Sequence, residues 1–224
     1  MESIILRASF FLLMIVIAYA LKRAGVLKKE DGISLARIVM NVTLPCAILV
    51  GFRTFVFEWS YMVIPVISLL AEVLMLAVGY AITRGRSRDE RIFYMMCLPA
   101  YNIGNFTLPF ISGMLGSAGI IAACLFDMGN SPMCLGLNFA FTALAIGSAA
   151  GRNPLRQLLM VFTKPSFIVY IVMLLLSASG LSLPDAVFDF AGLISPANGP
   201  MAMVMVGLML EFRFDRSKVT EAVA

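Results

Sequence analysis

Two asparagines and a glycine, Asn102, Gly104 and Asn105, lie between Pro99 and Pro109, near the centre of an apolar run long enough to cross a membrane. Each proline removes a backbone N–H group and clashes with the preceding helical turn, and lipid offers the freed groups no partners. We therefore expect a helix broken at membrane depth, with its polar groups facing protein or a water-filled cavity. Secondary transporters place substrate sites at such breaks, where a helix N-terminus and side-chain amides can hold a carboxylate. The pattern thus predicts noncovalent binding of a small anion.

Other polar groups lie inside further apolar runs. Asn41 precedes Pro45, and the proline either only kinks the helix or frees carbonyl groups that coordinate an ion or a substrate. Asp127 and Asn130 share another run, where Asp127 lies about 10 Å inside the apolar boundary by helix rise. Glu72 stands at the centre of a third run, where a charged carboxylate costs about 3 kcal/mol. We expect Glu72 to be protonated, hydrogen-bonded to another helix, or part of a proton or cation pathway, so Glu72 and Asp127 are the candidates for ion coupling.

Seven apolar runs separate the charged residues of the 224-residue chain, which is 61% hydrophobic and only 13% charged. Soluble domains carry about 25% charged residues, and about 20 apolar residues cross a membrane as a helix. The runs are residues 4–21, 33–52, 61–83, 92–115, 120–146, 166–183 and 191–210. Lysine and arginine concentrate in the loops after the first, third, fifth and seventh runs, which predicts an outside N-terminus and an inside C-terminus. We expect an all-α integral membrane protein that crosses the cell membrane, plasma or inner, about seven times.

The composition also excludes several functions. The sequence has no histidine, which removes Ser–His triads and HExxH metal sites. The four cysteines lie in apolar runs without CxxC spacing, so they predict neither a disulfide framework nor zinc. The net charge of +4 is divided among alternate loops and forms no continuous basic patch, so we expect no nucleic-acid partner. We expect no catalytic residue, no metal and no cofactor, and therefore no enzyme.

A weak internal repeat is visible, because the spacing from Gly25 to Pro45 equals the spacing from Gly180 to Pro200. If the first five spans form a unit, their odd number makes the next unit begin inverted, as in inverted-repeat transporters. The expected domains are a first five-helix repeat (1–150), a cytoplasmic linker (151–165), the start of an inverted second repeat (166–210) and a cytoplasmic polar tail (211–224). The broken helix near Asn102 would be the fourth, crossover helix of the first repeat.

The order of these motifs resembles the auxin efflux carrier family, which includes plant PIN-type carriers and bacterial permeases for malonate, malate and similar acids. The matching segments are residues 22–27, 41–45, 102–109, 127–130, 164–165 and 180–184. The resemblance implies ten helices in two inverted five-helix repeats, with the broken fourth and ninth helices meeting at the substrate site. The family would continue beyond the seventh span with three more helices. We therefore expect either a fragment of a longer protein or a short variant that completes its site by forming an oligomer.

The function predicted from this pattern is secondary transport of small organic anions by alternating access. Its expected partners are a carboxylate such as malonate, malate or an auxin-like acid, a proton or sodium ion, the lipid bilayer and a second copy of the chain. The predicted substrate contacts are Asn102, Gly104, Asn105, Pro109, Asn41, Pro45 and Asn130. Two alternatives stay open: a fragment without independent transport, and a protein that translocates protons or sodium. The seventh run lacks the lysine that a retinal-binding light sensor needs.

Overall fold

The computed structural model describes residues 2–99, 101, 103, 107–147 and 163–211, and the regular elements in these ranges are all helices. The α-helices are α1 (Glu2–Arg23), α2 (Lys29–Ile38), α3 (Leu44–Phe52), α4 (Val63–Ile82), α5 (Arg88–Cys97), α6 (Leu108–Pro132), α7 (Asn138–Ala145), α9 (Pro165–Ala178), α10 (Asp185–Ile194) and α11 (Asn198–Met209). Shorter turns of helix lie between some of them: η1 (Val39–Thr43), η2 (Trp59–Met62), η4 (Met133–Leu137) and η5 (Ser195–Ala197). The predicted all-α class is confirmed for the described part of the chain.

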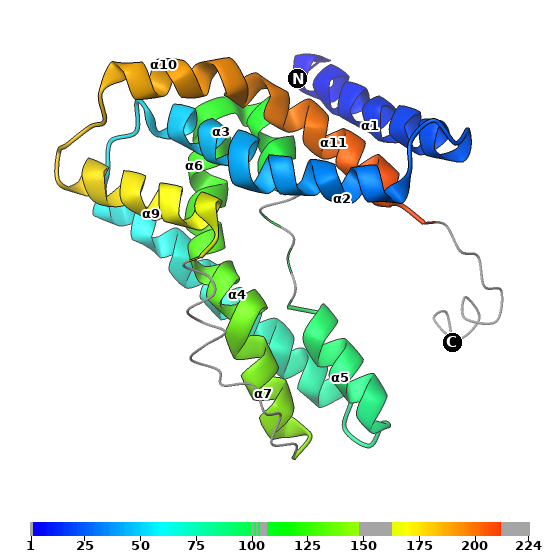
Figure 1. Cartoon of the computed structure of the whole chain (residues 1–224). Helices are drawn as coiled ribbons and strands as arrows, with labels where there is room; N and C mark the ends of the chain where they lie inside the picture. Colours follow the sequence, from blue (N-terminus) through cyan, green and yellow to red (C-terminus); the bar gives the residue numbers. More distant parts are fainter. Residues whose placement is uncertain (1, 100, 102, 104–106, 148–162, 212–224) are drawn as a thin grey trace.

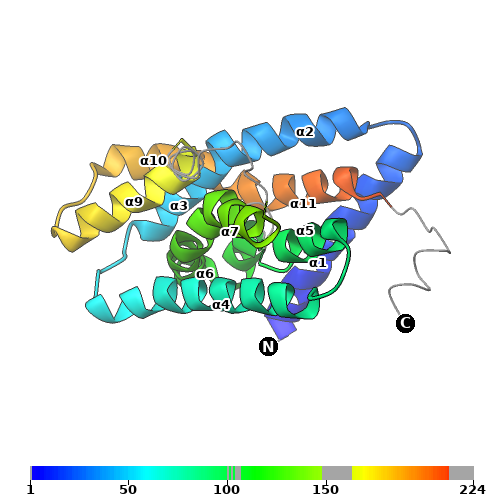
Figure 2. The same cartoon turned by 90° about the horizontal axis from the view of Figure 1, so that it is seen from below.

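The helices form two groups. Figure 1 shows α1, the α2–α3 pair and the α10–α11 pair gathered in one part of the molecule, while α4, α6, α7 and α5 extend away from it. The turned view in Figure 2 places α4 alongside α6 and α7, opposite α2. Helix α11 packs against α1 and α2, whereas α3 packs against α6, α9 and α10. Segments from the two ends of the chain therefore pack against each other.

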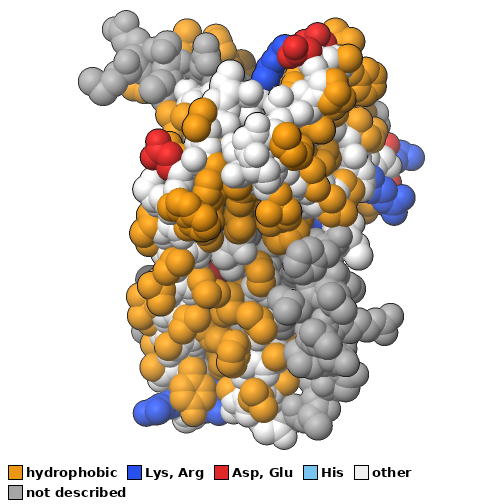
Figure 3. Space-filling view, turned by 90° about the vertical axis from the view of Figure 1, so that its left-hand side faces the viewer, with side chains coloured by type: hydrophobic (Ala, Val, Ile, Leu, Met, Phe, Trp, Pro, Cys, Tyr) orange, Lys and Arg blue, Asp and Glu red, His pale blue; other side chains and the backbone are white. Residues whose placement is uncertain are grey.

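Within the described part of the chain, three continuous helical segments are long and apolar enough to cross a membrane: Lys29–Phe52, Trp59–Ile82 and Asp185–Met209. They correspond to the second, third and seventh expected spans, and the apolar helix α9, which is shorter, corresponds to the sixth. On the face shown in Figure 3, hydrophobic side chains cover most of the surface and most charged side chains lie near its margins. This distribution is that of a protein whose sides contact lipid.

The fourth expected span is interrupted. Helix α5 begins with a capping box, in which Ser87 accepts from the Glu90 backbone N–H and the Glu90 side chain accepts from Ser87. It ends at Cys97, and Leu98 and Pro99 form a turn. Ile103 and Thr107 are in π-helical geometry, and α6 runs on from Leu108. Within α6, Gly116 has φ 59° and ψ −144°, so the chain bends sharply after the first turns of this helix. Among the described residues, the break therefore lies near Pro99, whereas the chain is already helical before Pro109.

Two other prolines do not break their helices. Next to Pro45 and to Pro132 the helix widens into π turns, η1 and η4, in which the Leu44 N–H bonds to the Val39 carbonyl and the Asn138 N–H bonds to the Met133 carbonyl. A π turn shifts the hydrogen-bond register by one residue and so lets a helix accommodate a local defect. The second span is therefore continuous rather than broken at Pro45.

The boundaries of the last two spans differ from the prediction. Helix α9 ends at Ala178 rather than near residue 183, because Gly180 adopts φ 70° and turns the chain. The following helix begins at Asp185 rather than near residue 191. An acidic residue in the first turn favours a helix start there, because it faces the positive end of the helix dipole. The hydropathy pattern did not indicate this start, because the first turns of α10 are less apolar than the remainder of the seventh expected span.

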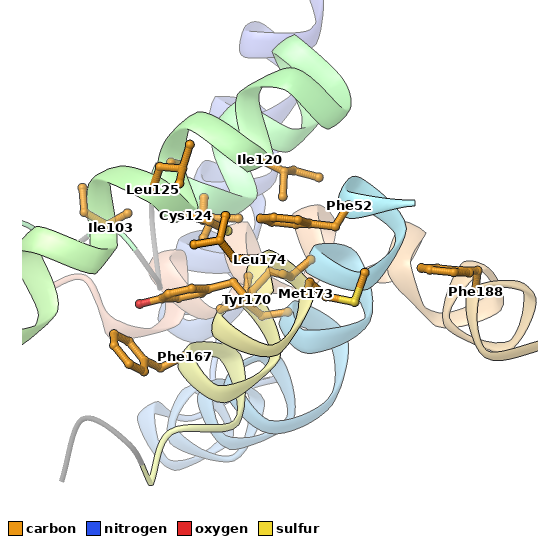
Figure 4. Packing of buried hydrophobic residues seen from close by; sticks show 14 residues of the cluster. Phe52, Ile103, Ile120, Cys124, Leu125, Phe167, Tyr170, Met173, Leu174 and Phe188 are labelled. Atoms are coloured by element: carbon orange, nitrogen blue, oxygen red, sulfur yellow. The ribbon is translucent and has the colours of Figure 1, made fainter. Parts of the chain in front are cut away.

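The main core lies where α3, α6, α9 and α10 meet. Figure 4 shows the ring of Tyr170 among Cys124, Leu174 and Phe167, with its hydroxyl at the edge of this cluster. Tyr170 is 1% exposed. A buried tyrosine normally finds a hydrogen-bond partner for its hydroxyl, and this one points toward the polar groups described next.

Candidate functional site

Helices α4 and α6 approach each other unusually closely at Gly129. A Cβ atom at this position would lie 2.4 Å from the Pro65 carbonyl oxygen and 2.9 Å from the Ser68 Cβ. Only a glycine permits the backbones of α4 and α6 to lie this close. Small residues at contacts between membrane helices commonly allow such close approach. The contact brings the polar face of α4 against the segment of α6 that carries Asp127.

Asp127 is the centre of a hydrogen-bonded cluster. Its Oδ1 accepts from the Asn130 amide at 2.8 Å, and its Oδ2 accepts from the Ser131 hydroxyl at 2.9 Å. The Tyr170 hydroxyl donates to Oδ2 at 3.5 Å, the limit of a hydrogen bond. The two short bonds come from residues three and four positions further along one helix, where side chains share a face. The bond from α9 was not predicted, because Tyr170 lies in an uninterrupted apolar run.

Asn130 joins this cluster to the interrupted span. Its Nδ2 also donates to the backbone carbonyl of Tyr101 at 3.4 Å, and Tyr101 lies between α5 and α6. A carbonyl outside a helix needs such a partner when no water or lipid headgroup is near. Asn130 is 3% exposed, so the bond lies inside the protein. The predicted Asp127–Asn130 pair and the predicted break are thus in direct contact.

Glu72 lies on α4 in a different environment. The residue is 0% exposed, and neither carboxylate oxygen has a hydrogen-bond partner among the described residues. The Ser68 hydroxyl, one turn earlier, has none either in the described part of the chain. Glu72 and Asp127 are close enough for their charges to interact, and so are Asp127 and Lys164. Two buried carboxylates near each other are difficult to keep ionised together without protons or cations.

The structure places the other predicted residues as follows. Asn102, Gly104 and Asn105 lie outside the described residues, so their predicted contacts stay predictions. Pro109 is the second residue of α6, and Thr107 before it is already in helical geometry. Pro45 is buried near the start of α3.

Asn41 lies elsewhere. It is exposed, and its amide donates to the Arg37 carbonyl at 2.7 Å within the same helix. It lines a cavity of about 280 Å³ together with Lys164 and Ser166, and no described contact joins it to Asp127. The sequence placed Asn41 beside a proline but could not show that its side chain faces outward.

The cluster offers hydrogen bonding and carboxylate chemistry rather than a metal site. Among the residues that the structure describes, no group of three or more histidine, cysteine or acidic side chains lies together. Asp127 accepts hydrogen bonds, while Glu72 can hold a proton or a cation. These roles fit binding and exchange of ions at the edge of a broken helix.

Comparison with known proteins agrees with this picture. The sequence profile of a family described as "Membrane transport protein" matches residues 4–143, which is more than half of the chain. The chain belongs to this family. The match confirms the resemblance to auxin efflux carriers, and it covers Asp127, Asn130 and Ser131 as well as the segment between α5 and α6. Membership in a transport family gives no support to an enzymatic role.

Two relatives from archaea are similar over most of the chain. An uncharacterized transporter of Methanothermobacter thermautotrophicus is 29% identical over 215 residues, which cover 94% of this chain and 69% of that protein. An uncharacterized transporter of Methanocaldococcus jannaschii is 23% identical over 210 residues, which cover 89% of this chain and 66% of that protein. The chain thus spans about two thirds of the length of these relatives. No solved structure matches it.

Proposed function

We propose that the protein is a secondary transporter of small organic anions, such as dicarboxylates, that works by alternating access in the cell membrane. The observation that carries this proposal is the bond from Asn130 to the Tyr101 carbonyl. It links a buried carboxylate cluster to Tyr101, in the non-helical segment that follows the end of α5 at Cys97. Interrupted helices beside buried ionisable groups are the usual place for substrate and coupling-ion sites in transporters.

The proposed substrate contacts are the amides of Asn102 and Asn105, the backbone at Gly104, and the start of α6 next to Pro109. A helix N-terminus presents unpaired N–H groups and a partial positive charge to a bound carboxylate. Asn130, which already bridges Asp127 and the break, is the proposed contact on the opposite side. This arrangement binds an anion without an arginine in the site.

The proposed coupling groups are Glu72 and Asp127. An anionic substrate entering beside two carboxylates needs a compensating cation, because like charges in a buried site repel each other strongly. Glu72 has no hydrogen-bond donor of its own among the described residues, so it is the better candidate to take up and release a proton or a sodium ion. Asp127 is held in place by its donors.

Contacts between the two ends of the chain support an inverted repeat. The Thr43 hydroxyl donates to the Asn198 Oδ1 at 3.0 Å, and these residues are 155 positions apart. Each precedes by two positions one of the prolines of the predicted repeat, Pro45 and Pro200. In an arrangement with approximate two-fold symmetry, equivalent residues touch each other only beside the axis. The proposed axis therefore passes between Thr43 and Asn198.

A second pair of contacts obeys the same offset. The Lys22 amino group donates to the Leu210 carbonyl, and the Ser177 hydroxyl donates to the Phe55 carbonyl. Shifting Lys22 by 155 positions gives Ser177, and shifting Phe55 by the same number gives Leu210. The two contacts are thus exchanged by the repeat, as two-fold symmetry requires. This reciprocity supports the inverted arrangement on which alternating access depends.

Transport by the 224-residue chain in proteoliposomes tests the proposal. Saturable uptake of radiolabelled malonate should exceed that of protein-free liposomes, and Asn102→Ala combined with Asn105→Ala should lower it at least about tenfold. Ser60→Ala, in the exposed helical turn η2, is the control and should transport normally. Asn41→Ala asks whether this outward-facing residue belongs to the site at all.

Three outcomes would contradict parts of the proposal. Uptake that survives the double asparagine variant with unchanged affinity removes the substrate site from the break. Flux of protons or sodium without any carboxylate favours the ion-translocating alternative. If the chain neither binds nor transports any carboxylate tested, the proposal of independent transport is wrong, and the chain could act only within a larger assembly.

A further inference from the structure

The cavity lined by Asn41 carries positive charge and lies outside the proposed transport site. Its volume is about 280 Å³, and it is formed by one face of α2 and η1 together with the first residues of α9. Among the residues that the structure describes, Arg37 and Lys164 both line it, and no acidic side chain does. The described residues include no ion-pair partner within 4.0 Å for either cation.

The depth of the cavity makes these charges unusual. Arg37 follows Lys29, the first residue of α2, by eight positions, which is about 12 Å along a helix. Helix α9 has 14 residues, so it rises about 21 Å, less than the roughly 30 Å of a hydrocarbon core. A cation that lies below the membrane surface needs water or an anionic partner. The cavity provides room for such an anionic partner.

The surroundings of the cavity are apolar and face outward. Ile33 lines it and is 42% exposed, while Ile38 and Val42 on the adjoining surface are each 44% exposed. A ligand that suits both parts must combine an anionic group with hydrocarbon. Basic pockets between membrane helices bind the headgroups of anionic lipids for this reason.

We propose that this cavity binds the phosphate group of an anionic phospholipid between Arg37 and Lys164, with the acyl chains lying along Ile38 and Val42. The Ser166 hydroxyl and the first turn of α9, whose N-cap side chain makes no capping bond, stand at the same opening. The lipid joins α2 to α9 across a contact that the protein alone leaves hollow. Lys164 is also close enough to Asp127 for their charges to interact, so the lipid site and the Asp127 cluster share this cation, but the lipid site does not depend on the transport function.

Native mass spectrometry of the full chain in detergent tests the site, with phosphatidylglycerol as the probe and phosphatidylcholine as the uncharged comparison. Phosphatidylglycerol should be retained preferentially. Arg37→Gln and Lys164→Gln should each weaken its retention about fivefold, and the double variant about thirtyfold. Arg88→Gln is the matched control, because Arg88 is exposed at the start of α5 and does not line the cavity.

Retention of phosphatidylglycerol by the double variant at the level of Arg88→Gln would overturn the proposal. Displacement of the lipid by an equal concentration of inorganic phosphate would also overturn it, because the site would then take free anions. If the double variant does not fold, the unmodified chain decides the question. A photoreactive phosphatidylglycerol should label residues 33–41 and 163–166, and labelling confined to other segments would exclude the site.

Discussion

Two buried carboxylates illustrate how the environment of a residue separates the roles of similar groups. Asp127 accepts hydrogen bonds from Asn130, Ser131 and Tyr170. Glu72, on the facing helix, has no donor within the described part of the protein. An ionised carboxylate without donors is costly at this depth, whereas a protonated one is tolerated. Asp127 is therefore suited to hold geometry, and Glu72 is suited to exchange a cation.

Replacing Glu72 by glutamine tests this difference. Glutamine keeps the shape of a protonated glutamate but cannot release a proton. We expect Glu72→Gln to fold with unchanged or increased thermal stability, while the uptake driven by a pH gradient falls at least about tenfold. Glu58→Gln, in an exposed loop, should retain this uptake. Gradient-driven uptake by Glu72→Gln at the unmodified level would exclude Glu72 as the proton carrier.

Sequence reasoning found the charged members of the site and Asn130, but it missed Tyr170 and the contact between Thr43 and Asn198. Glu72 and Asp127 are conspicuous because an ionisable group in an apolar run needs a physical reason. Tyr170 carried no comparable signal, since an aromatic side chain is expected in a membrane helix whether or not its hydroxyl is used. Thr43 and Asn198 stand beside prolines, but only the fold shows that they meet.

At the scale of elements, a single glycine sets the distance between α1 and α11. A Cβ on Gly207 would lie 2.4 Å from the Ile15 carbonyl oxygen and 2.7 Å from the Ala18 Cβ. Neither neighbour can rotate away, because one is backbone and the other is a methyl group fixed to it. This contact ties the last described helix to the first.

The variant Gly207→Ala should therefore lower the free energy of unfolding by about 1 to 3 kcal/mol, as overpacking does in a filled core. Gly192→Ala is the matched control. Its added Cβ would meet nothing within 4 Å, and alanine favours a helix over glycine by up to about 1 kcal/mol. Unfolding of both variants in mixed micelles provides the measurement. Equal stability of the two would show that α1 and α11 are not in close contact.

The start of α5 gives a prediction about pH. Hydrogen bonds from the Ser87 hydroxyl and backbone N–H hold the pKa of Glu90 below its ordinary value of 4.5. Folding lowers this pKa, so the cap stabilises α5 fully at a pH above the ordinary pKa of glutamate. The stabilisation disappears as the pH falls through the pKa that Glu90 has in the folded state. Hydrogen exchange at the first amides of α5, corrected for intrinsic rates, should show protection decreasing between about pH 6 and about pH 3.

Substitutions at the same cap separate its parts. Glu90→Gln should make the protection independent of pH in this range, because glutamine does not titrate. Ser87→Ala should lower the protection at every pH, since the hydroxyl that accepts from the Glu90 N–H is lost. Protection that stays constant in the unmodified chain would contradict the capping role of Glu90.

Prolines do not all have the same effect on the described helices. Helix α5 ends just before Pro99, whereas the helix passes Pro45 through a π turn. A proline alone costs one hydrogen bond, which a wider turn can absorb. The sequence does not show which solution the chain adopts, because that depends on packing against α11 and α9.

At the scale of the whole molecule, charge distribution and internal symmetry lead to the same topology. Arg53 is the basic residue of an expected outer loop, and it pairs with Asp185 at 2.8 Å and Asp189 at 3.0 Å. These hydrogen bonds raise the pKa of Arg53, so the residue stays charged while its charge is balanced locally. The excess of basic residues therefore remains on the opposite side, as expected for an inside C-terminus.

Equivalent residues of an inverted repeat must face opposite sides of the membrane, and one pair in this chain is well placed to show it. Val26 and Leu181 directly follow Gly25 and Gly180, two glycines with φ 75° and 70° that are related by the proposed offset. Their exposed fractions are 67% and 63%, so a cysteine at either position should react equally well when a reagent can reach it.

In intact cells, with the four native cysteines replaced by serine, a membrane-impermeant maleimide should label Leu181→Cys at once. It should label Val26→Cys only after the membrane is opened. Because the two positions match in exposure and backbone conformation, a difference in labelling reports the side of the membrane rather than local accessibility. Labelling of both cysteines from the same side would rule out the inverted repeat, and with it the alternating-access mechanism proposed for the protein.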